Sequence, residues 1–340
     1  MQNALFDKDR GYYCTKNPIG KNSDFITAPE ISQVFGELVA AYFLQIFALK
    51  KTSISSKKIA FVEMGAGRGT LFNDILQTIQ KLANKKNSLA LEFIECATFH
   101  IIEIGKVLRL AQQENLAGFA DKFKINWHEN FDDFLSFKND EAQIFFLSNE
   151  LFDCFAIDQF VFTEIGWRER LVAQKKFILA PFNKETHDFI EKEISCLAPI
   201  GAVFEVSFLA RNFVKQLCEA LKKFGGIAVN FDYGYLENKF FNTFQAVKNH
   251  QKVSVLENAP KCDITAQVDF KILQKIVENQ GLNSSLVSQS EFLKSLEIEE
   301  RRKILLEKNP KKAAEINSSI DRLIDSNQMG ELFKCLIFWK

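Results

Sequence analysis

Three glycines at positions 65, 67 and 69 form the pattern with the clearest chemical use in this sequence. They follow the apolar run IAFVEM at 59–64, and an amphipathic segment begins directly after them. Glycine permits a sharp turn and a close approach of the backbone to a ligand, and the first turn of a helix offers free N–H donors. Gly65, Gly67 and Gly69, together with Glu63 before them, are therefore expected to bind a nucleoside-type cofactor. A glycine-rich turn without a ligand is the alternative.

The residues around this loop favour S-adenosyl-L-methionine over a dinucleotide. A dinucleotide fingerprint requires a small residue at the position that Thr70 occupies. Glu103 ends the next expected strand, where a carboxylate can accept both hydroxyl protons of a ribose, although a solvated strand end is the alternative. Glu63 also fits the loop of a methyltransferase better than that of a dehydrogenase.

A second polar cluster, NELFD at 149–153, follows the apolar run AQIFFLS. Ligands of doubly wound sheets bind outside the carboxyl ends of the strands, so this cluster is expected beside the cofactor. Asn149, Glu150 and Asp153 are the candidate catalytic residues, and Asn149 is also a candidate cofactor ligand. A helix N-cap formed by Asn149, with the acids complementing the helix dipole, is the alternative.

The acids in this cluster suit one particular acceptor. The sulfonium of the cofactor and the guanidinium of an arginine are both cations, so a dry site that holds them together needs negative charge. Glu150 and Asp153 could orient the guanidinium and help to remove its proton. Asp232 and Tyr233, at the end of a later apolar run, are expected on the same rim, as is Glu205.

Bulk composition excludes several classes of protein. The 340 residues include 43 Lys and Arg and 43 Asp and Glu, so no net charge favours nucleic acid as a partner. Seven cysteines without a CxxC pair and four dispersed histidines predict neither disulfides nor a metal site, and favour a reducing compartment. The N-terminus does not resemble a signal peptide. The longest apolar stretch, around 38–49, is too short for a membrane span and is expected to be a buried helix.

The order of expected elements predicts an α/β fold with a doubly wound, mostly parallel sheet. Strands and helices alternate from residue 59 to about 147, and after 153 short strands around Gly166 indicate a meander. A helix near 208–224 leads to another strand, and two solvated helices are expected on either side of Pro310. The expected divisions are an N-terminal helical and loop segment over the cleft (1–52) and a main domain (53–340), with a β/α insertion at about 155–222 and a helical insertion at about 290–326.

Several separated motifs together resemble the MidA-type class I S-adenosyl-L-methionine-dependent methyltransferases of bacteria and mitochondria. These motifs are GYY (11–13), DFITAPEISQVFGE (24–37), EMGAGRGTL (63–71), NELFD (149–153), DYG (232–234), DITAQVDF (263–270) and QMGELFK (328–334). The mitochondrial member of that family assists complex I assembly by methylating an arginine of a subunit. The resemblance implies a Rossmann-like methyltransferase fold and symmetric dimethylation of arginine.

The resemblance also implies roles for individual residues. Gly65, Gly67 and Glu103 would contact the cofactor, and Asn149 and Glu150 would face the acceptor nitrogen. A lid or acceptor wall would be formed by Thr27, Pro29, Glu30 and Gln33. The DITAQVDF and QMGELFK segments are expected to be structural or rim elements.

The chain departs from the family pattern at two positions. Ala66 stands where family members usually have proline, and Gln267 stands where they usually have histidine. Ala66 should be tolerated, because backbone amides bind the ligand there, and Gln267 is given no role in proton transfer.

Three hypotheses follow. The first is a methyltransferase that acts on a protein arginine, for example in a respiratory complex I subunit, in the bacterial cytoplasm or the mitochondrial matrix. The second is a non-catalytic S-adenosylmethionine-binding assembly factor, or a methyltransferase with a non-protein acceptor. The third, a nicotinamide dehydrogenase, is weakened by Thr70. The oligomeric state stays open, with a homodimer as one alternative.

Overall fold

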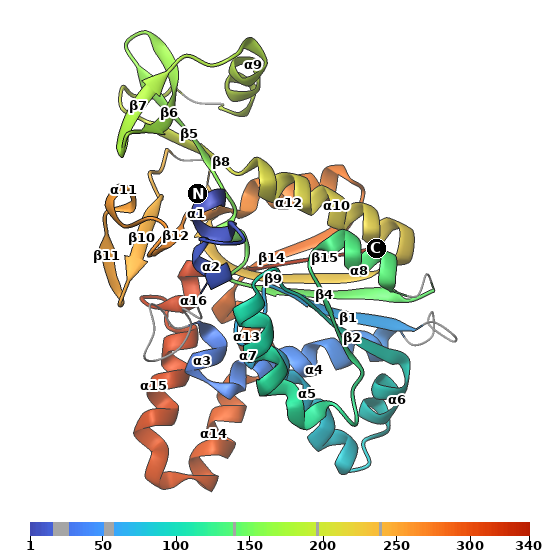
Figure 1. Cartoon of the computed structure of the whole chain (residues 1–340). Helices are drawn as coiled ribbons and strands as arrows, with labels where there is room; N and C mark the ends of the chain where they lie inside the picture. The colour runs from blue at the N-terminus through green and yellow to red at the C-terminus, as the bar shows by residue number, and fades with distance from the viewer. Residues whose placement is uncertain (16–26, 51–57, 139–140, 195–196, 238–239) are drawn as a thin grey trace.

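The computed structural model describes residues 1–15, 27–50, 58–138, 141–194, 197–237 and 240–340. A large central sheet organises these residues (Figure 1). Its strands are β1 (Ile59–Met64), β2 (Ala97–Ile102), β3 (Ile125–His128), β4 (Gln143–Asn149), β9 (Gly226–Tyr235), β14 (Asn283–Ser288) and β15 (Phe333–Trp339), with the short β13 (Val268–Asp269) paired to β9.

The strand order in this sheet is β14-β15-β9-β4-β1-β2-β3. The strands from β3 to β9 run parallel, whereas β15 is antiparallel to both of its neighbours. The expected mostly parallel α/β sheet is therefore confirmed. The chain runs outward from β1 through β2 to β3 and then returns to β4 on the other side of β1. This reversal opens a crevice at the carboxyl ends of β1 and β4, where ligands of such sheets bind.

Helices cover both faces of the sheet. Both faces are apolar because alternate residues of β1 point to opposite sides of the sheet. Phe61 packs into an apolar cluster on one face, and Ala60 and Val62 pack into a second cluster on the other face. The first face is covered by α4 (Gln33–Lys50), α5 (Thr70–Asn84) and α6 (Ser88–Cys96), and the second by α8 (Phe131–Phe137), α10 (Phe208–Phe224) and α12 (Phe270–Asn279). Helix α7 (Lys106–Leu116) contacts α5 and is followed by the 3₁₀ turn η2 (Ala117–Phe119).

Helix α4 is long and apolar enough to cross a membrane, and among the described residues it alone meets that test. Half of it is buried inside the protein. Its Phe43 ring contacts Phe61 of β1 edge-on at 5.0 Å, and Phe47 contacts Phe93 of α6 at 5.3 Å. The apolar stretch around 38–49 is thus a core helix, as the sequence predicts.

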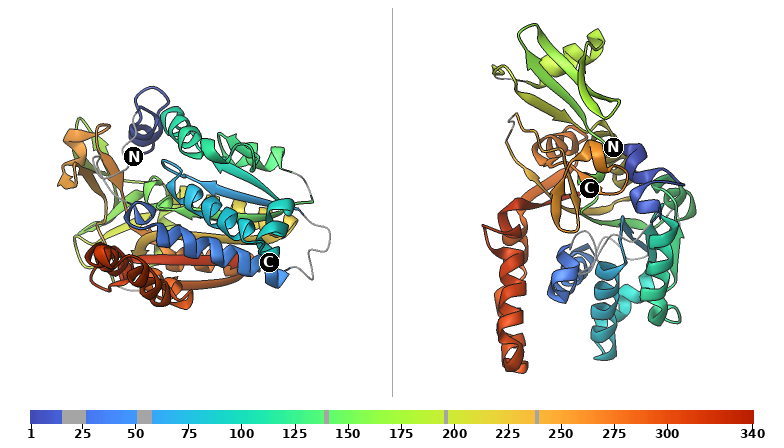
Figure 2. Two further views of the ribbon diagram at one scale, coloured as in Figure 1. Left: turned by 90° about the horizontal axis from the view of Figure 1, so that it is seen from below. Right: turned by 60° about the vertical axis from the view of Figure 1, so that its left-hand side comes forward.

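A four-stranded antiparallel sheet projects from the main domain, and we call it the inserted sheet (Figure 2). Its order is β7-β6-β5-β8, and the turn before Gly166 joins β5 to β6 as the sequence predicts. Its elements are β5 (Asp158–Thr163), β6 (Gly166–Ala173), β7 (Lys176–Ala180), α9 (Lys184–Glu193) and β8 (Val203–Val206). The sheet ends at Val206, and α10, which the expected range of 155–222 assigns to the insertion, packs instead on the main sheet.

A second small sheet was not expected from the sequence. It has the order β11-β10-β12, and α11 (Val255–Asn258) lies between its last two strands in the chain. Its strands are β10 (Gln245–Lys248), β11 (Gln251–Val253) and β12 (Asp263–Thr265).

The described residues before α4 form three short helices, namely α1 (Gln2–Phe6), α2 (Tyr12–Thr15) and α3 (Ala28–Ile31). Residues 16–26, which include the start of the DFITAPEISQVFGE motif, lie outside the described residues.

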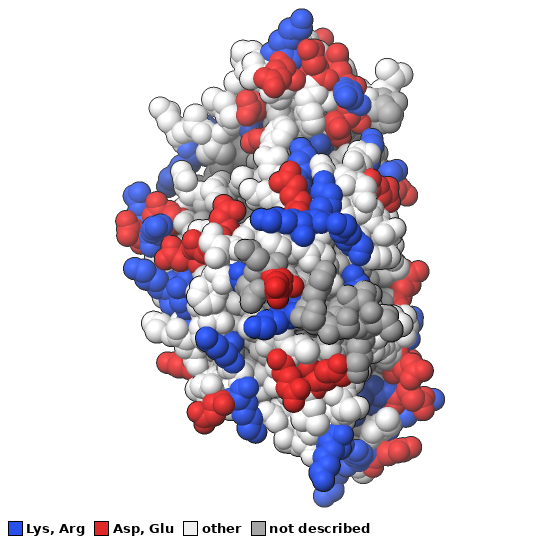
Figure 3. All heavy atoms as spheres, turned by 90° about the vertical axis from the view of Figure 1, so that its right-hand side faces the viewer, with Lys and Arg blue, Asp and Glu red and all other residues white. Residues whose placement is uncertain are grey.

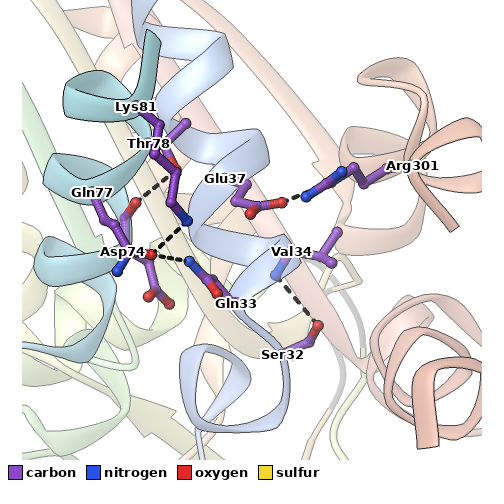
Figure 4. A network of polar contacts seen from close by, with 9 residues as sticks. All are labelled: Ser32, Gln33, Val34, Glu37, Asp74, Gln77, Thr78, Lys81 and Arg301. Carbon is purple, nitrogen blue, oxygen red and sulfur yellow. Dashed lines mark hydrogen bonds and ion pairs between the residues drawn. The ribbon is translucent and has the colours of Figure 1, made fainter. Parts of the chain in front are cut away.

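Helices near the C-terminus form an arm beside α4. They are α13 (Gln289–Ser295), α14 (Ile298–Lys308), the 3₁₀ turn η4 (Pro310–Lys312), α15 (Ala313–Ile324) and α16 (Met329–Leu332). The expected break at Pro310 is confirmed, but α15 is not fully solvated, because it buries Ile320 and Leu323. The Arg301 guanidinium of α14 donates to Glu37 of α4 at 2.8 Å (Figure 4).

Candidate active site

A cavity of about 200 Å³ opens at the carboxyl ends of β1, β2 and β4. Its wall combines the glycine loop, the turn after β4, the N-terminal segment and the three-stranded sheet. Eleven of the residues singled out in the sequence contribute to this wall, namely Thr27, Pro29, Glu30, Glu63, Gly65, Gly67, Glu103, Asn149, Glu150, Asp153 and Tyr233.

The glycine loop joins β1 to α5 in a conformation that side chains disfavour. Gly65 has φ +72°, and a Cβ atom there would lie 2.9 Å from Leu151 Cδ1. Gly69 has φ +79° and caps the N-terminus of α5, but it lies outside the cavity wall. Its N–H donates to the Ala66 carbonyl at 2.7 Å, which closes the turn. The loop thus brings its backbone and the start of α5 to the cavity.

Glu63, the penultimate residue of β1, has a carboxyl oxygen without a hydrogen-bond partner in the part of the chain that the structure describes. The residue is buried, and its Oε2 has no hydrogen-bond partner among the described residues. Burial raises the pKa of this carboxyl to about 8. A buried acceptor on the wall of a cavity calls for a donor or a cation from a ligand.

Glu103 follows β2 and is held from two sides. Its Oε1 accepts the Gly105 N–H at 2.7 Å, and its Oε2 accepts from Gln112 Nε2 at 3.2 Å. Burial raises its pKa to about 7, although these hydrogen bonds and Arg109 oppose the shift. Gln112 also donates to the Gly67 carbonyl at 2.9 Å, so one amide links the glycine loop to Glu103. Gln112 was not recognised in the sequence, because one glutamine in a helix carries no motif.

Glu150 is the residue after β4, and it adopts a left-handed conformation with φ +51°. Its Oε1 accepts the Ala28 N–H at 3.3 Å and the Asn149 Nδ2 at 3.2 Å. Burial, and then the charge of Asp153, raise its pKa to about 8. Asn149 Oδ1 has no hydrogen-bond partner among the described residues.

Asp153 lies in the 3₁₀ turn η3 (Phe152–Cys154) and faces Tyr233. Its Oδ1 also lacks a described hydrogen-bond partner, and burial raises its pKa. Asp232 is fully buried and lies outside the cavity wall. Its Oδ2 accepts the N–H groups of Phe152 and Asp153 at 2.8 and 3.2 Å. Asp232 therefore positions the turn that carries Asp153 and does not form part of the rim.

Helix α3 closes one side of the cavity and touches both halves of the site. Its first residue, Ala28, donates to Glu150, and Glu30 accepts from Thr70 Oγ1 at 2.5 Å and lies 4.0 Å from the Arg68 guanidinium. Gln33 does not reach the cavity. It points toward α5, where its amide donates to Gln77 (Figure 4).

The wall residues that were not selected from the sequence include Tyr13, Cys154, Asp263 and Thr265. The Tyr13 hydroxyl donates to Asp263 Oδ1 at 2.8 Å and lies 3.3 Å from Cys154 Sγ. The GYY and DITAQVDF motifs contain three of these residues, Tyr13, Asp263 and Thr265, and were the available signal. Glu205 lies away from this cavity, beside a smaller one, where it accepts the N–H groups of Thr243 and Phe244.

The electrostatics of the cavity suit a cationic ligand. Six carboxyl side chains and one arginine contribute to its described wall, and all three partnerless buried atoms there are oxygens. S-adenosyl-L-methionine carries a sulfonium and an ammonium group, so Glu63, Asn149 and the N–H groups of the glycine loop fit it. Groups of His, Cys, Asp and Glu that could hold a metal ion are absent from the described part of the chain.

Charge on one face of the molecule is mixed. In the face of Figure 3, basic and acidic side chains alternate without one extended patch of either sign.

Comparisons with known proteins point to one family. A family model of S-adenosyl-L-methionine-dependent methyltransferases matches residues 38–288. Protein arginine methyltransferase NDUFAF7, mitochondrial, from Danio rerio is 31% identical, over 98% of this chain and 81% of its own length. The Homo sapiens protein of the same name is 29% identical, over 98% and 77%. In fold, the chain is similar to a Burkholderia thailandensis protein crystallised with S-adenosyl-homocysteine, with a TM-score of 0.80 and 22% identity over 100% of this chain and 86% of that one.

Proposed function

Because the chain belongs to the family of S-adenosyl-L-methionine-dependent methyltransferases, we propose that it methylates an arginine side chain on another protein. The observation that carries the proposal is the acidic end of the cavity, where Glu150 and Asp153 lie beside the glycine loop. A guanidinium has a pKa of about 12 or higher and stays charged at neutral pH, so a buried site that binds it is stabilised by carboxylates. The names of the relatives support the same acceptor.

The residues of this chain would divide the work. Bound S-adenosyl-L-methionine supplies the activated methyl group. Glu150 and Asp153 would clamp the guanidinium through charge-assisted hydrogen bonds and turn one nitrogen toward the cofactor. Glu150 would take up the proton that this nitrogen loses. Tyr233 and the residues of α3 would exclude water, which strengthens each of these interactions.

The first test is a labelling experiment. The protein is incubated with S-adenosyl-L-methionine carrying a labelled methyl group and with a protein extract of the source organism. We expect one main protein to be labelled. After acid hydrolysis of that protein, the label should be recovered in methylarginine. Glu150→Gln should lower the rate by about 100-fold or more, because it removes the proton acceptor and the charge.

A matched control tests whether the loss of activity is specific to Glu150. Glu129→Gln changes an exposed glutamate outside the cavity and should label at the wild-type rate. Label only in lipids or small molecules, or only in methyllysine, would contradict the proposal. If Glu150→Gln restores cells that lack the gene while Gly67→Val does not, the non-catalytic assembly factor is the better description.

We also propose a respiratory complex I subunit as the acceptor and symmetric dimethylarginine as the product, on the resemblance given above. Mass spectrometry of the labelled protein identifies the acceptor and separates symmetric from asymmetric dimethylation. Sedimentation of the purified protein tests the homodimer. The curated relatives are named mitochondrial, which favours the mitochondrial matrix for a eukaryotic source and lends no support to a cytoplasmic location.

A further inference from the structure

Strand β7 forms an edge of the inserted sheet, and no described strand pairs with its outer side. Its residues Phe177, Ile178 and Leu179 are 44%, 44% and 50% exposed. Because successive side chains point to opposite faces, β7 exposes apolar groups on both faces as well as a free backbone edge. On the paired strand β6, Leu171 and Val172 are 39% and 58% exposed and enlarge this surface.

Such an edge is unusual in a protein that acts alone. Soluble proteins protect exposed edge strands with proline, several charges, bulges or a covering element, because an open edge pairs with other chains. β7 contains no proline, and Lys176 is its one charged residue. The edge is therefore suited to accept a strand from another molecule.

The hairpin that carries this edge is well ordered by its own contacts. Two residues, Gln174 and Lys175, form the turn, with φ +48° and +58°, and Ala173 lies opposite Lys176. This geometry corresponds to the tight hairpin turn that matches the twist of the strands. The Arg170 guanidinium lies 5.4 Å from the centre of the Phe177 ring and donates to Gln159 Oε1 at 3.3 Å. A preformed edge loses little conformational entropy when a strand is added.

The inserted sheet is joined to the chain close to the active site. Its first strand begins at Asp158, shortly after Cys154 of the cavity wall. Gln159 lies opposite Arg170, so residues 172–173 of β6 extend beyond the first residue of β5, Asp158. The β6–β7 turn accordingly points back toward the main domain, which contains the cavity. A protein that pairs with β7 would thus be held near the site of methyl transfer.

The small size of this edge favours a transient partner over a permanent one. A five-residue strand spans about 17 Å. Pairing along it would bury on the order of a few hundred Å², well below the roughly 1,200 Å² of stable interfaces. A second copy of the chain held by this edge alone would not form a stable dimer. An enzyme must release its methylated product, so a small contact suits an acceptor.

We propose that β7 binds an extended segment of the protein acceptor as an additional antiparallel strand, a proposal that rests on the function given above. The apolar side chains of Phe177 and Leu179 would contact alternate side chains of that segment. Because β7 carries Lys176 and no acid, a segment with an aspartate or glutamate opposite Lys176 is favoured.

The test compares methylation of a protein acceptor with methylation of a short peptide acceptor. The variant Phe177→Ser/Leu179→Ser changes two exposed side chains, so the fold should persist. At limiting concentrations of extract, its labelling of the extract protein should fall about tenfold or more, the ratio that corresponds to about 1.4 kcal/mol of lost binding. Methylation of a short synthetic Gly-Arg-Gly peptide, which does not span β7 and the cavity together, and binding of S-adenosyl-homocysteine should stay unchanged. Ile178→Lys, which adds a second charge to the edge, should act in the same direction.

The control variant is Leu110→Ser, which changes a 62% exposed leucine on α7 and should leave both rates unchanged. The proposal is overturned if the double variant labels the extract protein normally, or if it loses activity on the peptide to the same extent. It is also overturned if the wild type sediments as a dimer that the double variant dissociates, since β7 would then bind a second copy. If the wild type labels no protein at all, the proposed function itself has failed.

Discussion

Glu150 combines backbone strain with a buried charge. A non-glycine residue with φ +51° is uncommon and costs on the order of 1 kcal/mol or more, and here the carboxyl group also has its pKa raised to about 8. Such costs are tolerated where function requires the geometry. The turn after β4 therefore holds Glu150 ready for a cation at the expense of stability.

The first prediction concerns the pH dependence of stability. The carboxyls of Glu63 and Glu150 have pKa values of about 8 in the folded protein, against about 4.3 in an unfolded chain. The folded state therefore binds more protons, and stability should be greatest at low pH and decline as the pH rises through about 8. Glu150→Gln removes one of these groups and should raise the melting temperature of the ligand-free protein at about pH 8.5 by about 2–4 °C. Its effect at pH 5 should be smaller, as thermal denaturation followed by circular dichroism can measure. Equal melting temperatures of variant and wild type at pH 8.5 would contradict this account.

A second prediction separates the positioning role of Asp232 from direct contact with ligands. Asp232→Leu removes the acceptor of the Phe152 and Asp153 N–H groups and should cost about 2–4 kcal/mol of stability. Asp232→Asn keeps one acceptor oxygen and should fold, with kcat reduced about tenfold and the affinity for S-adenosyl-homocysteine nearly unchanged. Calorimetry and labelling rates measure the two effects. A large loss of cofactor affinity in Asp232→Asn would instead place this residue at the cofactor.

Among the elements, α7 is the one that joins the two parts of the cofactor site. Its Gln112 donates to both the Gly67 carbonyl and Glu103, and accepts from Trp127 Nε1 at 3.2 Å. We expect Gln112→Ala to weaken binding of S-adenosyl-homocysteine by about tenfold, because two hydrogen bonds to buried groups are lost. Its exposed neighbour offers the control, since Gln113→Ala should bind as the wild type does. Titration calorimetry at constant pH distinguishes them, and equal affinities would show that the bridge is dispensable.

The elements that were predicted correctly have strong local signals. β1 matches its expected bounds because an apolar run ends at glycines, and α5 and α7 show clear helical periodicity. Strand β14, NSSLVS, was missed because polar residues occupy four of its six positions, and pairing with β15 defines it. The three-stranded sheet was missed because its strands contain at most four residues, too few to show a clear alternation.

Site residues that belong to one sequence motif could be predicted. Site residues that come from distant segments of the chain could not. Tyr13 and Asp263 form a hydrogen bond across 250 positions of sequence. No local pattern contains that information, because the contact depends on how the N-terminal segment packs on the three-stranded sheet. Gln33 shows the opposite error, since its motif placed it at the cleft while the start of α4 turns it toward α5.

On the scale of the whole molecule, the C-terminal helical arm is attached to the core partly through one ion pair. The Arg301–Glu37 pair is partly buried, whereas Lys303–Glu300, 2.7 Å apart on the same arm, is exposed. Arg301→Ala should cost about 1 kcal/mol and increase amide hydrogen exchange in α14 and α15, while Lys303→Ala should change neither. Exchange measured by mass spectrometry tests this directly. Equal protection in both variants would mean that apolar packing alone attaches the arm.

Helix α3 has a kinetic consequence. It is four residues long, yet it contacts Glu150 through Ala28 and Thr70, the first residue of α5, through Glu30. An incoming guanidinium would share the Glu150 carboxylate with the Ala28 N–H, so binding of the acceptor would be coupled to the position of α3 and, through Thr70, to the cofactor loop. We expect a compulsory order of addition with the cofactor first, and product-inhibition patterns should reveal S-adenosyl-homocysteine as the last product to leave.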